Sequence, residues 1–97
     1  MNVNEIKNII KSEELLLKKK FRVKKIGIFG SYSRGEQRKT SDIDILIEYY
    51  ETPSMFEYLD LEEFLSKILN GIKIDLVMKN SLKRYIGERI LSEVIYI

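Results

Sequence analysis

Residues 29–47 read FGSYSRGEQRKTSDIDILI and join two apolar segments through a glycine–serine turn. The apolar run from Lys25 to Phe29 predicts a first strand, and Ser31 to about Gln37 predicts one or two helical turns. Asp42 to Tyr50 predicts a second strand, because apolar and polar residues alternate along it. A small-residue turn at one strand end and two carboxylates on the next strand can bind a nucleotide triphosphate together with its cations.

Alternation along the second strand places its side chains on two faces. One face is purely aliphatic and carries Ile43, Ile45 and Ile47. The other face is largely acidic and carries Asp42, Asp44, Leu46 and Glu48. We expect helices to cover the aliphatic face and the acidic face to stay open to water or ligand, because unpaired charges are costly to bury.

A third strand, Ile72 to Met78, repeats this pattern. Its aliphatic side chains Ile72, Ile74 and Leu76 share one face, and Lys73, Asp75 and Val77 share the other. If the two acidic strands are neighbours in a suitable register, the carboxylates of Asp42, Asp44 and Asp75 converge.

The remaining segments predict helices. Apolar residues at helical spacing predict a first helix over about Asn4–Lys20, with a stripe made of Ile6, Ile9, Ile10, Leu16 and Leu17. Ser54 and Glu57 have the spacing of a capping box, which predicts a helix that ends at Asn70-Gly71. Its predicted core stripe is Phe56, Leu59, Phe64, Leu65, Ile68 and Leu69. Asn80 or Ser81 is expected to cap a last helix, whose stripe is Leu82, Tyr85, Ile86 and Ile90. Val94 to Ile97 is expected to be an edge strand or a docked tail.

Together these elements predict an α/β (α+β) fold with a small mixed sheet whose helices cover one face. The 97 residues suffice for a single domain, residues 1–97, and leave no room for a second lobe. No apolar run reaches membrane-spanning length and the N-terminus lacks a signal pattern, so the expected location is cytoplasmic.

Composition restricts the chemistry. The formal charge is only +2, with Lys and Glu interspersed, which argues against a dedicated nucleic-acid surface. There is no cysteine and no histidine, which excludes disulfides, thiolate metal sites and imidazole bases. Carboxylates alone point to hard, oxygen-ligated cations such as Mg²⁺.

Each candidate residue also has a structural interpretation. Asp42 and Asp44 alone could be a strand-end cap and an acid paired with a Lys or Arg. Gly30-Ser31 favours the functional interpretation, because a glycine after a strand lets a phosphate approach the main chain. Arg34 could pair with a phosphate oxygen or be a surface charge, whereas Gly35 is expected to end the short helix.

The compound pattern resembles that of the minimal nucleotidyltransferases, small members of the DNA polymerase β superfamily. It consists of Gly30-Ser31, ten intervening residues, Asp42-Ile43-Asp44 and a later Asp75. The resemblance implies a nucleotidyltransferase fold and two Mg²⁺ ions held by Asp42, Asp44 and Asp75. It also implies that Gly30 and Ser31 bind the phosphates of ATP, and that Asp75 helps to deprotonate an acceptor hydroxyl.

Family members of this size are similar to the antitoxins of two-gene modules whose toxin is a HEPN-domain ribonuclease. The resemblance implies transfer of AMP from ATP to a tyrosine of that toxin. Two alternatives remain open at this point: transfer to a small hydroxylated molecule of the aminoglycoside kind, and a non-catalytic antitoxin that acts by binding.

Overall fold

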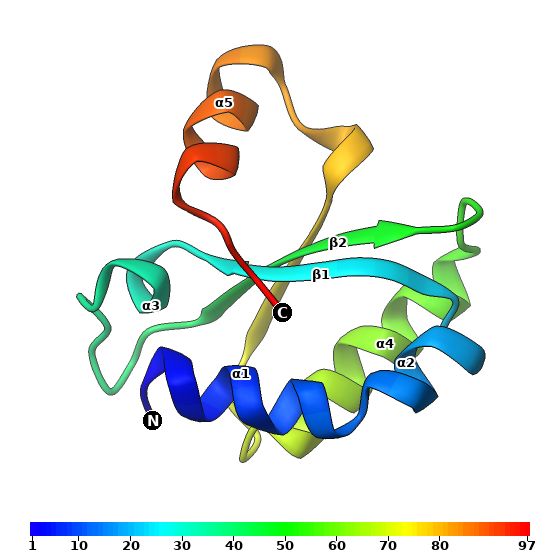
Figure 1. Ribbon diagram of the computed structural model, residues 1–97, viewed down its shortest axis with the longest axis horizontal. Helices are drawn as coiled ribbons and strands as arrows, with labels where there is room; N and C mark the ends of the chain where they lie inside the picture. Colours follow the sequence, from blue (N-terminus) through cyan, green and yellow to red (C-terminus); the bar gives the residue numbers. More distant parts are fainter.

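Four strands form one mixed sheet in the order β3-β2-β1-β4 (Figure 1). They are β1 (Val23–Phe29), β2 (Ile43–Tyr49), β3 (Ile74–Met78) and β4 (Ile95–Tyr96). β1 runs antiparallel to both β2 and β4, and β2 runs parallel to β3. The predicted mixed sheet is therefore confirmed, and the C-terminal residues form an edge strand.

The computed structural model describes the backbone of residues 1–97 and all side chains except those of residues 84 and 85. Its helices are α1 (Val3–Ser12), α2 (Glu14–Lys19), α3 (Ser31–Arg34), α4 (Met55–Ile68) and α5 (Arg84–Glu93), and a 3₁₀ turn, η1 (Lys79–Ser81), follows β3. In Figure 1, α1, α2 and α4 lie on one side of the sheet and α5 lies on the other. None of the helices described here is long and apolar enough to cross a membrane.

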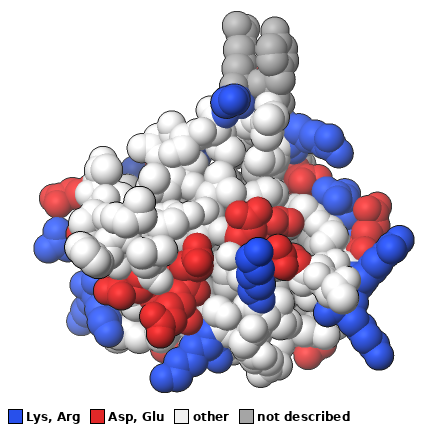
Figure 2. All heavy atoms as spheres, turned by 180° about the vertical axis from the view of Figure 1, so that it is seen from behind, with Lys and Arg blue, Asp and Glu red and all other residues white. Residues whose placement is uncertain are grey.

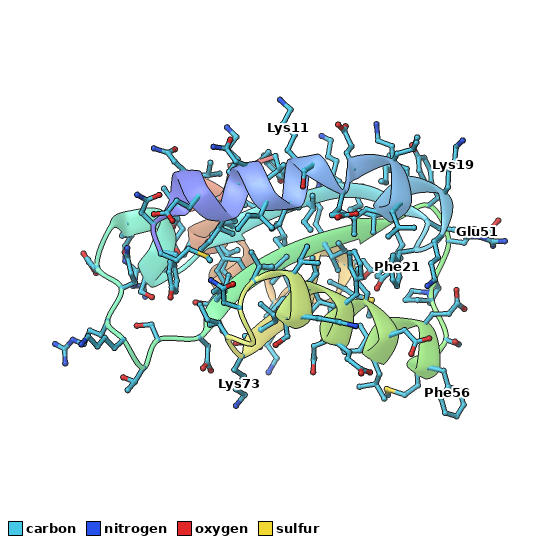
Figure 3. The ribbon with its side chains drawn as sticks, turned by 90° about the horizontal axis from the view of Figure 1, so that it is seen from below. Lys11, Lys19, Phe21, Glu51, Phe56 and Lys73 are labelled. Carbon is cyan, nitrogen blue, oxygen red and sulfur yellow. The ribbon has the colours of Figure 1, made fainter. Side chains whose placement is uncertain are left out.

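The aliphatic face of the sheet forms the core, as its alternation predicted. Ile43, Ile45 and Ile47 are fully buried. They pack with side chains of the covering helices, which include Ile6, Ile10, Leu17, Leu61, Leu65 and Leu69. Phe21 also reaches toward α4, where its ring lies 5.0 Å from that of Phe64 (Figure 3).

The predicted core stripe of α4 is partly wrong. Leu61, Leu65 and Leu69 are the fully buried residues, whereas Phe56 is 80% exposed and Leu59 is 47% exposed. Successive helical residues turn by about 100°, so a helix that points Leu61 at the sheet turns Leu59 to the opposite side. Figure 3 shows Phe56 directed outward at the end of α4. The predicted capping box of Ser54 and Glu57 is present.

The N-terminal helix also differs from its prediction. It begins at Val3, capped by Asn2, and a break at Glu13 divides it into α1 and α2. Leu17 keeps the face of Ile6 and Ile10 and is buried, whereas Leu16, which the sequence placed in the same stripe, is exposed.

The predicted cap of the last helix is wrong. Asn80 and Ser81 belong to η1, and α5 begins after Lys83, which provides no side-chain cap. Ile86 is exposed, and Tyr85 lies outside the described side chains.

α5 and β4 limit how open the acidic face is. Leu46 belongs to this face and Phe29 is the partner of Asp44, and both are buried. Val94, between α5 and β4, lies so close to β1 that a Cβ on Gly27 would be 2.5 Å from Val94 Cγ2. Among the acidic side chains of this face, Asp75 is exposed, whereas Asp42, Asp44 and Glu48 are partly buried.

Candidate active site

Asp44 and Asp75 occupy the same level of two neighbouring strands. Parallel pairing of β2 with β3 makes them direct Cα partners, so both side chains leave the same face of the sheet. Asp44 is half-buried and Asp75 is exposed. The register condition that the sequence left open is thus met for this pair.

The electrostatics of Asp44 reflect this crowding. Burial raises the pKa of Asp44 from its usual 3.8 to about 6, and the neighbouring carboxylates of Asp75 and Asp42 contribute to the increase. Arg34 acts in the opposite direction. A raised carboxyl pKa beside other acids indicates a site with excess negative charge, which a bound cation would compensate.

Asp42 lies one residue before β2. Its side chain is half-exposed, and its Oδ2 lies 3.9 Å from Nζ of Lys73, a residue that points away from the body of the protein (Figure 3). At this separation, and with the lysine largely in water, the pair is weak. Figure 2 shows acidic side chains gathered near the middle of the rear side of the molecule, beside a basic one.

The acidic side chains fit a Mg²⁺ site whose coordination is completed by oxygen atoms of a substrate. Among the described side chains, no three acidic groups are close enough to form a ready-made cage. Mg²⁺ commonly binds through one or two carboxylates together with substrate phosphates and water. Asp44 and Asp75, with Asp42 at the strand end, provide such a partial set.

The glycine–serine turn lies directly against Asp44. Gly30 has a φ of +74° and a ψ of −151°, a conformation almost restricted to glycine. A Cβ at this position would lie 2.9 Å from Cγ of Asp44 and 3.2 Å from its Cβ. Gly30 therefore allows the turn and the carboxylate to come together.

Hydrogen bonds within the turn fix its shape. The carbonyl of Gly30 accepts from the Ser33 hydroxyl at 2.8 Å and from the Ser33 amide at 3.1 Å. Tyr32 is buried in the core, and Gly35 ends α3 in the left-handed conformation, as predicted. Ser33 thus has a structural role, while the half-buried Ser31 begins the helix beside the acidic pair.

Arg34 is held by two carboxylates. Its Nη1 donates to Glu93 Oε2 at 2.9 Å and its Nε donates to Glu36 Oε2 at 3.1 Å. Both hydrogen bonds raise the pKa of Arg34, the one with Glu93 more strongly. Arg34 is therefore a fixed positive charge at the turn.

Glu93 is a residue that the sequence analysis did not identify. Its Oε1 accepts the Gly30 amide proton at 3.1 Å. Burial opposes its ionisation, but the hydrogen bonds from Arg34 and Gly30 outweigh that effect and lower the pKa of Glu93. No periodicity marks Glu93, because it reaches the site through the pairing of β4 with β1.

A hollow of about 460 Å³ lies toward the opposite end of β2. Its lining includes Tyr50, Pro53 and Met78. The carboxylates lie at the start of β2, so the site is defined by their meeting with the turn and not by this hollow.

Comparison with known proteins agrees with this geometry. The family model of the nucleotidyltransferase domain matches residues 4–97. A relative from Methanocaldococcus jannaschii, named provisionally as a protein adenylyltransferase, is 49% identical over 96 residues, which cover 98% of this chain and 97% of the relative. The protein adenylyltransferase MntA of Thermococcus cleftensis is 43% identical over 97 residues, which cover 100% of this chain and 97% of that protein.

Among solved structures, a crystal structure of a toxin–antitoxin complex with AMP-PNP matches with a TM-score of 0.72 and 25% identity. The match covers 89% of this chain and 70% of the matched chain. The turn, the paired carboxylates and these matches together establish that the chain belongs to the nucleotidyltransferase domain family.

Proposed function

We propose that this protein is a Mg²⁺-dependent protein adenylyltransferase that transfers AMP from ATP to a tyrosine of a HEPN-domain toxin and thereby acts as its antitoxin. The observation that carries the proposal is the pairing of Asp44 with Asp75 beside the Gly30 turn. The name of the Thermococcus relative and the toxin–antitoxin complex with AMP-PNP support the donor and the partner class.

The roles of the residues follow from their positions. Asp44 and Asp75, with Asp42, would hold the Mg²⁺ ions. Bound Mg²⁺ would neutralise phosphate charge and lower the pKa of an acceptor hydroxyl. Ser31 donates its hydroxyl to a phosphate oxygen, and Gly30 keeps the turn against Asp44. Arg34 adds positive charge next to the same phosphates.

The transfer is a single displacement at phosphorus. The acceptor oxygen bonds to the α-phosphorus of ATP, the bond from that phosphorus to the bridging oxygen breaks, and pyrophosphate leaves. The hydroxyl proton passes to Asp75, whose exposed carboxylate lies on the open part of the acidic face, or to water. The protein contributes mainly positioning and electrostatic stabilisation.

A protein acceptor suits the exposure of this site. Asp75 is exposed, and the acidic pair lies on the sheet surface and not inside the hollow near Pro53. A folded partner that docks over the carboxylates would exclude water from the site, as enclosure by a second lobe does in larger enzymes.

Intact-mass spectrometry tests the proposal. The protein is incubated with a HEPN-domain toxin, ATP and Mg²⁺. Each transfer should add one adenylyl unit to the partner, and Asp44→Ala should add none. Modification of an aminoglycoside but of no protein would identify a small-molecule enzyme. Inhibition of the partner without any mass change would identify an antitoxin that acts by binding.

A further inference from the structure

Glu93 is the last residue of α5, and the strand β4 that follows it lies beside β1, which leads into the turn. Gly27 pairs with Tyr96 and Ile28 pairs with Ile95 in antiparallel β1 and β4. Gly30 lies one residue beyond the end of β1 and Glu93 lies two residues before β4, so this pairing brings the two residues close together. The backbone pairing at one edge of the sheet thus determines which side chain meets the turn.

Glu93 links two groups of the turn with its two carboxylate oxygens. Oε1 accepts from the Gly30 amide at 3.1 Å, and Oε2 accepts from Arg34 at 2.9 Å. Gly30 is also the residue whose missing side chain admits Asp44. One carboxylate therefore fixes both the backbone that contacts Asp44 and the nearby guanidinium.

The link is better protected than an ordinary surface ion pair. The Glu93 side chain is only 20% exposed, whereas Glu36, the other carboxylate on Arg34, is 66% exposed. Val94, which follows Glu93, packs so tightly on β1 that only glycine fits at position 27. Glu93 is therefore held in place by the strand that follows it.

We propose that Glu93 is a positioning residue of the active site: it holds the Gly30–Ser31 turn against Asp44 and orients Arg34, so that the turn is preorganised for the phosphates of a nucleotide. This inference rests on the proposed function for the identity of the ligand. The positioning itself is a property of the ligand-free protein. Glu93 acts through Gly30 and Arg34 and has no role in the chemical step.

Amide hydrogen exchange measured by NMR on the ligand-free protein tests the positioning. Glu93→Ala should accelerate exchange of the Gly30 amide about tenfold or more, because that amide loses its acceptor. Glu93→Gln should keep most of the protection, because the glutamine carbonyl can still accept the Gly30 proton. The matched control is Glu36→Gln, which removes the other charge on Arg34 and should leave Gly30 unchanged. Circular dichroism establishes that each variant is folded at the temperature used.

Titration with ATP and Mg²⁺ then measures whether the position of the turn affects nucleotide affinity. Glu93→Ala should weaken ATP binding about tenfold, Glu93→Gln less, and Glu36→Gln less than twofold. Unchanged Gly30 exchange in Glu93→Ala would overturn the proposal. Tighter ATP binding by Glu93→Ala would also overturn it, since Glu93 would then compete with phosphate for the turn. If the wild type binds no ATP, the proposed function fails, and the exchange data alone decide whether Glu93 positions the turn.

Discussion

Asp44 and Asp75 are direct partners across adjacent parallel strands, and burial, reinforced by the neighbouring Asp75 carboxylate, makes Asp44 an unusually weak acid. Burial, the Asp75 charge and the Asp42 charge raise the pKa of Asp44 to about 6. A carboxylate with such a pKa is destabilising to the folded protein when it is ionised and no cation is bound. Ionised Asp44 therefore reduces the stability of the protein when no cation is bound.

Asp44→Asn should stabilise the metal-free protein at pH 7 while abolishing nucleotidyl transfer. A shift of this size corresponds to at most about 3 kcal/mol, and solvent screening reduces the expected gain to about 1–2 kcal/mol. The melting temperature measured with EDTA should rise by several degrees. Asp60→Asn, at an exposed position of α4, is the control and should leave the melting temperature nearly unchanged.

The gain from Asp44→Asn should depend on pH. At low pH Asp44 is protonated in both the folded and the unfolded wild type, so its stabilising protonated form is fully present. As the pH rises from about 4 to about 6, the unfolded state loses its proton first and the wild type loses stability. The difference between variant and wild type should therefore increase over this range and then level off. A difference independent of pH would contradict the assignment.

Leu61→Ala should destabilise the fold much more than Leu59→Ala. Leu61 is fully buried against the core, and removing such a side chain costs about 2–5 kcal/mol. Leu59 lies on the same helix and is 47% exposed, so its truncation should change stability by about 1 kcal/mol or less. Urea denaturation measures the loss of stability in each variant. Similar losses would contradict the orientation of α4 in which Leu61 faces the core and Leu59 faces solvent.

Alternation of side chains was enough to predict the sheet faces, and it placed Asp44 and Asp75 on one face, while their direct pairing depends on a strand register that the sequence left open. The prediction succeeded because strand periodicity is unambiguous when aliphatic and acidic residues alternate. The rotation of α4 could not be predicted in the same way. Residues 55–69 contain apolar side chains on more than one face, and only packing against the sheet selects Leu61 over Leu59.

Glu93 could not be predicted from the sequence for a different reason. It lies 63 residues from Gly30 along the chain. Its position depends on the register of β4, which has only two residues and therefore carries almost no periodic signal. The packing of α5 on the acidic face depends on the same connection, which is why the sequence suggested a more open face.

Ser31→Ala should weaken binding of ATP with Mg²⁺ by about 1–3 kcal/mol, the range for a hydrogen bond to a charged group. The fold should remain intact, because Ser33 and not Ser31 makes the side-chain hydrogen bond to the Gly30 carbonyl. Calorimetric titration measures the affinity. Ser12→Ala, which removes a hydroxyl from the end of α1, is the control for general effects of losing a serine. Equal affinity in Ser31→Ala and the wild type would remove Ser31 from the nucleotide site.

Gly30→Ala should both destabilise the protein and reduce the stabilisation that Mg²⁺ gives. The new Cβ would meet Asp44 Cγ at 2.9 Å, in addition to the cost of the backbone conformation. Gly35→Ala is a matched control, because Gly35 also has a positive φ, of +70°, but a Cβ added there would have no atom within 4 Å.

Comparing these two variants separates the contact from general strain. Gly35→Ala should cost about 1 kcal/mol and leave the Mg²⁺ effect unchanged. Asp44→Ala removes most of the atoms that the alanine at position 30 would meet, so Gly30→Ala should cost less in that background. The coupling energy between positions 30 and 44 is measured by urea denaturation of the wild type, Gly30→Ala, Asp44→Ala and the double variant. Melting temperatures with and without Mg²⁺ measure the effect of the ion on each protein. Additive costs would show that Gly30 is required for its backbone conformation alone, whereas coupling of about 1 kcal/mol or more would show that the turn and the Asp44 carboxylate depend on each other.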